Sequence, residues 1–177
     1  MAGEDLGPPL DPTALLAVLV RHGVDFVVVG GIAGLALGSS YPTYDLDVAY
    51  SRDPANVKRL VAALRELDVR LRGAPANLPF LLDERTVENG ANFTFETKYG
   101  HFDVLADVGG ISSYELLRRE STSEDIGGHI VRVASIDHLI AMKRAANRTK
   151  DKLMLEEYIV LADELDGQAG PQREKRG

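Results

Sequence analysis

The chain has 177 residues, of which 45% are hydrophobic and 27% charged, the composition of a globular domain with its own core. It contains no cysteine, which excludes disulfides and thiolate metal sites, and no apolar run approaches the roughly 20 residues that span a membrane. The net charge of -7 argues against a basic coat for nucleic acid but is compatible with a basic patch inside a cleft.

The first half of the chain predicts alternating helices and strands. Residues 1–10 are expected to form a flexible leader, whose acidic, proline-containing sequence is unlike a signal peptide, so a cytoplasmic location is the default expectation. Asp11 followed by Pro12 is typical of a helix start. Helices are expected over residues 12–22, 32–37 and 54–67, and strands over 26–29 and 45–50.

The second half predicts two β-hairpins and three helices. The hairpins span residues 91–106 and 122–134 and turn at 98–100 and at the glycine pair 127–128, and residues 73–79 form a loop. Helices are expected over 113–120, 135–147 and 151–165, followed by a polar, disordered tail at 166–177. Residues 11–165 are therefore expected to be one α/β domain, with a mixed, twisted sheet and helices packed against it.

Two aspartates on one predicted strand indicate a cation site. Residues two apart in a strand face the same side, so Asp45 and Asp47 project together. Strands disfavour aspartate, and two like charges repel, but a shared cation offsets both costs. Magnesium prefers oxygen ligands and keeps phosphate and water in its shell, so Mg²⁺ or Mn²⁺ is the expected ion.

The glycine pair upstream of these aspartates indicates a phosphate site. Gly30 and Gly31 lie between a predicted strand and a predicted helix, where backbone N–H groups and the helix dipole attract phosphate. Glycine allows a phosphate to approach the backbone closely. Ser39 and Ser40 are candidate hydroxyl partners between the glycines and the carboxylates.

A third carboxylate and a lysine complete the predicted site. Asp103 lies inside the apolar strand 101–106 and needs a partner or a cation there. Asp107, at the end of that strand, is the competing candidate, and we favour Asp103. Lys143 continues the apolar helical stripe of Ile136, Leu139 and Ile140, so it needs a negative partner such as a nucleotide phosphate.

These motifs together carry a family resemblance. A glycine pair, a short helix, Asp-x-Asp on a strand and a later lone aspartate resemble the DNA polymerase β-like nucleotidyltransferase superfamily. The chain is most similar to the small bacterial members associated with abortive infection and toxin–antitoxin systems. The segment 136–143, followed by 148–151, also resembles that group, and the resemblance covers roughly residues 24–160. Gly31 departs from the pattern, because many members have serine there.

The resemblance implies a magnesium-dependent transferase that binds ATP or another nucleoside triphosphate. It would transfer a nucleoside monophosphate to an acceptor hydroxyl, with tRNA or a protein as the acceptor, and a cognate partner protein is expected from the toxin–antitoxin link. Asp45, Asp47 and Asp103 would bind the metal and act in catalysis together with Lys143. The nucleotide site would include Gly30, Gly31, Ser39, Ser40, Arg148 and Asp151.

Other interpretations of the same residues stay open. The chain could modify a small molecule such as an antibiotic, or could be a non-catalytic module that acts through a partner protein. Asp45 and Asp47 could form a solvated strand face, and the glycine pair a tight turn only. Lys143 could extend to water along the stripe, and residues 148–152 could be a loop in which Asp151 caps a helix.

Overall fold

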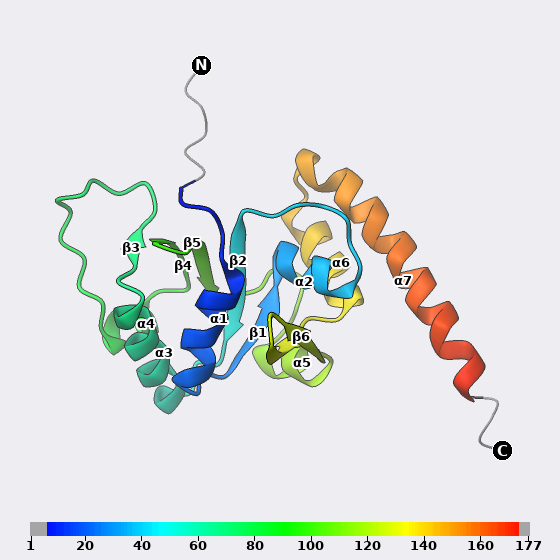
Figure 1. Ribbon diagram of the computed structural model, residues 1–177, viewed down its shortest axis with the longest axis horizontal. Coiled ribbons are helices and arrows are strands. Elements are labelled where there is room, and N and C mark those ends of the chain that lie inside the picture. The colour runs from blue at the N-terminus through cyan, green and yellow to red at the C-terminus, as the bar shows by residue number, and fades with distance from the viewer. Residues whose placement is uncertain (1–6, 174–177) are drawn as a thin grey trace.

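A seven-stranded mixed sheet is the framework of the chain (Figure 1). The computed structural model describes residues 7–173, and its strands lie in the order β3–β4–β5–β2–β1–β7–β6. The β2–β5 and β1–β7 pairs are parallel and the other pairs antiparallel, which confirms the predicted mixed sheet. The strands are β1 (Phe26–Val29), β2 (Asp45–Tyr50), β3 (Arg70–Leu71), β4 (Asn92–Thr97), β5 (Gly100–Leu105), β6 (Thr122–Ile126) and β7 (His129–Val133).

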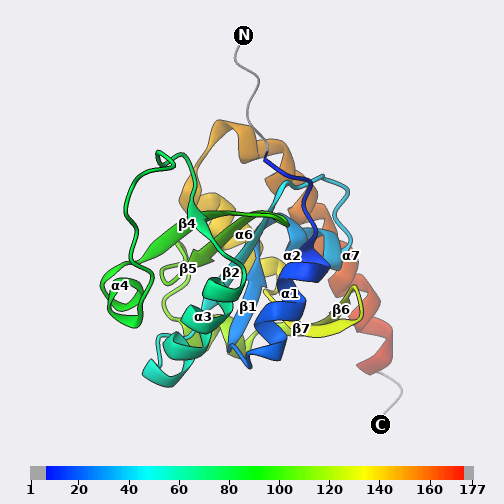
Figure 2. The same cartoon turned by 60° about the vertical axis from the view of Figure 1, so that its left-hand side comes forward.

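Helices cover both faces of this sheet. In Figure 2, α1 and α3 lie in front of the central strands and α6 and α7 lie behind them. The helices are α1 (Pro12–Arg21), α2 (Gly30–Leu37), α3 (Pro54–Glu66), α4 (Glu84–Asn89), α5 (Tyr114–Arg119), α6 (Ile136–Ala146) and α7 (Lys152–Arg173), with a 3-10 turn η1 (Thr149–Asp151) before α7.

The core fixes which way the two central strands face. Leu46 and Val48 of β2 are fully buried, as are Phe102 and Val104 on the neighbouring β5. Because side chains alternate along a strand, the residues between them point to the opposite face. Burial of the apolar set therefore directs the aspartates of β2 and β5 to a common side of the sheet.

Local sequence signals set several element boundaries as predicted. The Asp11 side chain accepts a hydrogen bond from the N–H of Ala14 at 3.0 Å, which caps α1, and Ser135 caps α6 in the same way. The second hairpin turns at Gly127 and Gly128, which both have positive φ, a conformation that favours glycine.

The structure differs from the sequence-based expectation in three segments. Strand β3 and helix α4 were not predicted, because each is too short to show a hydrophobic period. The last helix continues to Arg173 rather than ending near residue 165, and its end shows no apolar stripe that a sequence pattern could follow. Parts of the predicted leader and tail, residues 1–6 and 174–177, lie outside the described residues. Among the described helices, none is long and apolar enough to cross a membrane.

A buried asparagine near the start of α3 is hydrogen-bonded to Asp25, the residue directly before β1. Asn56 is 1% exposed; its side chain accepts from the N–H of Asp25 and donates to the carbonyls of Asp25 and Ser51. We expect Asn56→Ala to destabilise the fold by about 1–3 kcal/mol, because it removes the three hydrogen bonds that this buried side chain makes with the backbone. Chemical denaturation would measure the loss, and the exposed Lys58→Ala on the same helix is the control. Equal stability of both variants would contradict this role.

Candidate active site

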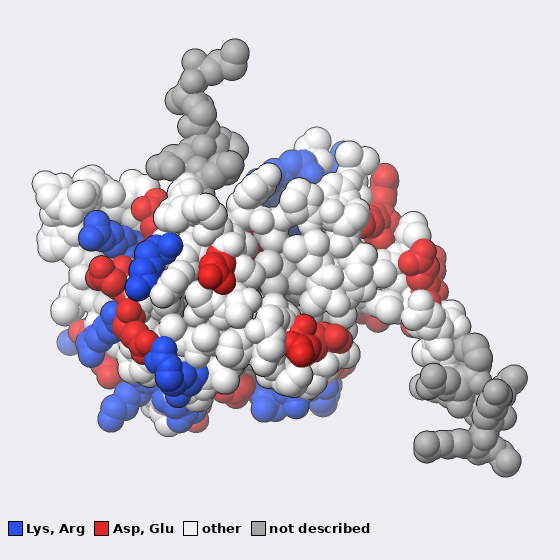
Figure 3. Space-filling view, viewed as in Figure 1, with Lys and Arg blue, Asp and Glu red and all other residues white. Residues whose placement is uncertain are grey.

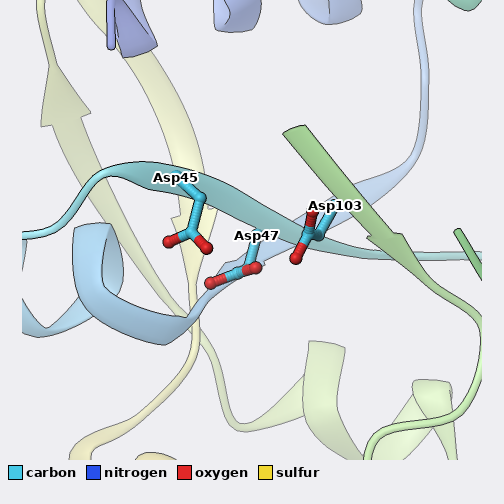
Figure 4. A group of neighbouring side chains, drawn as sticks. All are labelled: Asp45, Asp47 and Asp103. Atoms are coloured by element: carbon cyan, nitrogen blue, oxygen red, sulfur yellow. The ribbon is translucent and has the colours of Figure 1, made fainter. Parts of the chain in front are cut away.

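Three carboxylates from two adjacent strands form the centre of the site. In the parallel pairing of β2 with β5, Asp47 lies directly opposite Asp103, and Asp45 is two residues before Asp47. One ligand oxygen from each of the three lies within 4.8 Å of those of the others. Figure 4 shows the three side chains gathered on the same side of the sheet. The strand register thus brings together the three aspartates that the sequence singled out.

Burial and mutual repulsion make this cluster electrostatically unfavourable. Burial raises the pKa of Asp47 well above its ordinary value, and the charges of Asp45 and Asp103 raise it further. Burial also raises the pKa of Asp103, although the adjacent guanidinium of Arg72 opposes that shift. A positive charge placed among these oxygens would stabilise the ionised form of all three.

The glycine pair allows the end of β1 and the start of α2 to lie against the carboxylates. Gly30 has φ of +67°, and a Cβ atom there would lie 2.1 Å from Oδ2 of Asp47. A Cβ at Gly31 would lie 2.6 Å from the side chain of Thr43. Any larger residue at either position would displace a neighbouring side chain. The close approach places the N-terminal turn of α2 beside the carboxylates.

A pocket of about 360 Å³ opens over this group. Its walls combine the acidic cluster with three cationic side chains, Lys143, Arg148 and Lys150, on α6 and the turn that follows. Charges of opposite sign on facing walls suit a ligand that carries both phosphates and metal ions. Besides the acidic cluster and the three cationic side chains, the pocket is lined by Val29, Gly30, Gly31, Pro42, Thr43, Leu105, Leu139, Met142, Ala146, Asp151, Met154 and Tyr158.

Lys143 has a negative partner within the protein. Its Nζ lies 3.1 Å from Oδ1 of Asp151, and both side chains are largely buried, at 21% and 11% exposed. Asp151 ends the 3-10 turn before α7. The sequence pattern required a negative partner for Lys143, and the structure supplies a carboxylate in addition to any ligand. Both residues line the pocket, so they lie with the other predicted site residues.

The predicted hydroxyl partners and the competing aspartate lie elsewhere. Ser39 and Ser40 donate hydrogen bonds to the carboxylate of Glu157 on α7, at 3.1 and 2.9 Å, and do not line the pocket. These bonds attach the loop after α2 to the C-terminal helix. Asp107 follows β5 and lines a separate pocket of about 80 Å³.

Sequence reasoning missed three residues at the site. Thr43 donates a hydrogen bond to Oδ1 of Asp45 at 3.2 Å, and Arg72 forms an ion pair with Asp103. Tyr158, on α7, lines the pocket with a buried hydroxyl that has no hydrogen-bond partner, and burial raises its pKa to about 12. Thr43 precedes Asp45 by two residues and offered a local signal. The other two reach the site from distant segments without one.

The donor set fits hard divalent cations. Three carboxylates on a rigid sheet offer only oxygen ligands, which Mg²⁺ and Mn²⁺ prefer. Their positions beside the glycine pair leave room for phosphate oxygens as further ligands. Burial and then the charges of Asp45 and Asp103 raise the pKa of Asp47, and the positive charge of Lys143 only partly opposes that shift.

Comparison with known proteins supports the fold. No family model and no curated protein sequence matches the chain. Among solved structures, ANT(2'')-Ia in complex with adenylyl-2''-tobramycin superposes with a TM-score of 0.54 at 16% identity and covers 89% of each chain. The lincomycin-bound lincosamide antibiotic adenylyltransferase LnuA gives 0.57 at 10% identity over 90% of this chain and 98% of its own.

A third similar structure is a candidate nucleotidyltransferase from Thermotoga maritima. It has a TM-score of 0.52 at 12% identity and covers 86% of this chain and 96% of that one. At these identities the similarity establishes architecture. The chain has the nucleotidyltransferase fold, as its glycine pair and aspartates predicted.

The repulsion among the carboxylates predicts that neutralising one of them stabilises the metal-free protein. Because folding raises the pKa of Asp47, stability contributed by this group falls as pH rises from its unfolded pKa through the folded one. Each unit of that elevation corresponds to about 1.4 kcal/mol. At pH 7 in EDTA, Asp47→Asn should therefore melt higher, by roughly 2–4 °C per kcal/mol recovered.

Thermal melts over pH 4–8 would test this, with the exposed Asp163→Asn as the matched loss of one negative charge. The gain should shrink toward low pH, where Asp47 of the wild type is protonated. A lower melting temperature for Asp47→Asn at pH 7 would show that the cluster does not destabilise the fold.

Proposed function

We propose that the protein transfers a nucleoside monophosphate from a nucleoside triphosphate, with ATP as the first candidate, to an acceptor hydroxyl. The observation that carries this proposal is the placement of Asp45, Asp47 and Asp103 beside Gly30 and the cationic wall of one pocket. The similarity to adenylyltransferase structures supports the same reaction class.

The residues divide the chemistry among them. Backbone N–H groups at Gly30 and Gly31 bind the triphosphate at the N-terminus of α2. The three aspartates hold the divalent cations, which when bound stabilise the attacking and leaving oxygens. The acceptor oxygen forms a bond to the α-phosphorus, the bond to the bridging oxygen breaks, and pyrophosphate leaves. Asp103 completes this carboxylate set and is the residue that we assign to take the acceptor's proton.

The cationic wall binds the negative end of the nucleotide. Lys143 and its partner Asp151 both line the pocket, so Lys143 can contribute positive charge to a triphosphate and still has a negative partner when the pocket is empty. Arg148 and Lys150 add two further positive charges to the lining of the pocket. In Figure 3, Lys and Arg atoms gather over the start of α7, whereas acidic atoms line the helix further along. The three cationic side chains offer positive charge to phosphate within a pocket that also holds carboxylates, although the net charge of the chain is -7.

Two classes of acceptor have support. The resemblance to abortive-infection and toxin–antitoxin members favours tRNA or a protein hydroxyl, with a cognate partner protein. A small-molecule acceptor is the second candidate, because ANT(2'')-Ia and LnuA were solved with an adenylylated aminoglycoside and with lincomycin. A non-catalytic role through a partner protein is the outcome if no transfer is found.

A pyrophosphate-release assay with each triphosphate, in Mg²⁺ or Mn²⁺, tests the reaction. α-Labelled triphosphate, incubated with separate tRNA, protein, aminoglycoside and lincosamide fractions, then identifies the acceptor by the fraction that retains the label. Label in the tRNA or protein fraction supports the first class, and label in a drug fraction supports the second. No metal-dependent pyrophosphate release with any triphosphate and any fraction would exclude the proposed activity.

The assignment of Asp103 as the third carboxylate is tested by comparing it with Asp107, which lies close to it in the sequence. Asp103→Asn should reduce turnover by about a hundredfold or more, because it removes a ligand and proton acceptor at the reacting centre. Asp107→Asn, which changes the same charge outside the cluster, should keep most activity. Steady-state kinetics on both variants is the measurement. An essential Asp107 beside a dispensable Asp103 would reverse the assignment.

The role of Lys143 is tested by variants that separate its contact with the triphosphate from its ion pair with Asp151. Lys143→Met should weaken triphosphate binding by about tenfold or more, the cost of losing a charge-assisted contact. It should also lower the melting temperature, because Asp151 is left buried without its partner. Adding Asp151→Asn should restore stability but not affinity. Calorimetric titration with a non-hydrolysable triphosphate would measure affinity, and full recovery of affinity in the double variant would make the role of Lys143 structural.

A further inference from the structure

An arginine forms an ion pair with one of the three carboxylates that we assign to cation binding. Nη2 of Arg72 lies 2.6 Å from Oδ1 of Asp103, with the two side chains 26% and 14% exposed. The same nitrogen lies 3.3 Å from the carbonyl of Phe95. An ion pair this short and this shielded from water is strong, and guanidinium stays charged at all working pH values.

The strand register places this arginine at the edge of the carboxylate cluster. The N–H of Arg72 donates to the carbonyl of Thr94 at 2.9 Å, and Thr94 lies opposite Asp103 in the β4–β5 pair. Arg72 therefore reaches across β4 to the outermost of the three aspartates. Asp45 and Asp47 lie further along the same face, and no ion pair holds either of them among residues 7–173.

The ion pair and a cation would share one carboxylate, that of Asp103, in which Arg72 already contacts Oδ1. A cation bound at Oδ1 would lie beside the guanidinium, and two positive charges at that separation repel. Asp45 and Asp47 carry no such competitor. The three carboxylates are therefore unequal as ligands, although they lie within 4.8 Å of one another.

The arginine is placed where it can move away. It follows β3, a two-residue strand at the edge of the sheet, and precedes the irregular segment 73–83. Its Nε is buried without a hydrogen-bond partner, so the docked side chain is incompletely satisfied. Release needs no change in the pairing of β2 with β5, because Arg72 belongs to neither strand.

We propose that Arg72 is a competing counter-ion that makes the cluster bind divalent cations in order. Asp45 and Asp47 would hold the first ion, and Asp103 would help to hold the second only when Arg72 leaves. This rests on the proposed function in that the carboxylates hold cations. It adds a positioning residue that keeps the second ion out until something displaces the guanidinium.

The test uses MnCl₂ alone with the full chain, measured by calorimetric titration and by electron paramagnetic resonance of free Mn²⁺. The wild type should bind one ion tightly and a second much more weakly. Arg72→Met should tighten the weaker event about tenfold or more, the equivalent of one lost charge-assisted contact. Asp103→Asn should remove the weaker event in both backgrounds.

Arg70→Met is the matched control, because it removes the same charge from an exposed position on β3. It should change the weaker affinity by about threefold or less, the effect expected of a screened surface charge. Arg72→Gln keeps a hydrogen-bonding side chain without charge and should behave as Arg72→Met does, so a folding defect of one variant does not decide the result. Mn²⁺ should also raise the melting temperature more in the Arg72 variants than in the control.

Two results overturn the proposal in distinguishable ways. If the wild type binds Mn²⁺ but both Arg72 variants match Arg70→Met, the counter-ion role fails and the metal site stands. If neither the wild type nor any variant binds Mn²⁺, both the metal site of the proposed function and the proposed order of cation binding are wrong.

Discussion

Repulsion among Asp45, Asp47 and Asp103 is the constraint around which the neighbouring structure is arranged. The aspartates cannot move apart, because Leu46, Val48, Phe102 and Val104 anchor the opposite faces of the same strands in the core. The register of β2 with β5 then fixes Asp47 opposite Asp103. Thr43 and Arg72 each contact one carboxylate, but the pKa of Asp47 remains well above its ordinary value. Protonation of Asp47 or a bound positive charge would relieve the cluster.

The cationic side chains of the pocket come from different elements than the carboxylates do. They lie on α6 and on the turn before α7, whereas the carboxylates lie on the sheet. Glu157, which accepts hydrogen bonds from Ser39 and Ser40, ties α7 to the loop between α2 and β2. Tyr158, the next residue, packs so closely on α2 that a Cβ at Gly34 would lie 2.4 Å from its hydroxyl. The C-terminal helix therefore supports both α2, which begins at the glycine pair, and the cationic segment of α6 and η1.

The sequence predicted the parts of the site that depend on local periodicity. Alternation along one strand placed Asp45 and Asp47 on one side, and the apolar neighbours of Asp103 indicated a strand position rather than a loop. The partners of these residues were not predictable, because they come from distant segments. Arg72 meets an aspartate 31 residues away, and Ser40 meets Glu157 at a separation of 117. For Lys143, the stripe indicated the need for a negative partner but not that a carboxylate eight residues on would provide it.

The long connection between β2 and β5, the two strands that carry the aspartates, has a consequence for how the protein folds. Strands β2 and β5 are neighbours, yet α3, β3, α4 and β4 all lie between them along the chain. Parallel pairing across such an excursion closes a long loop and is slow compared with hairpin formation. A growing polypeptide that has emerged only as far as β4 has two of the three aspartates and no complete carboxylate cluster. A cation held by the finished cluster would act on the native state alone, so thermal stability would then depend on the divalent-ion content of the surroundings.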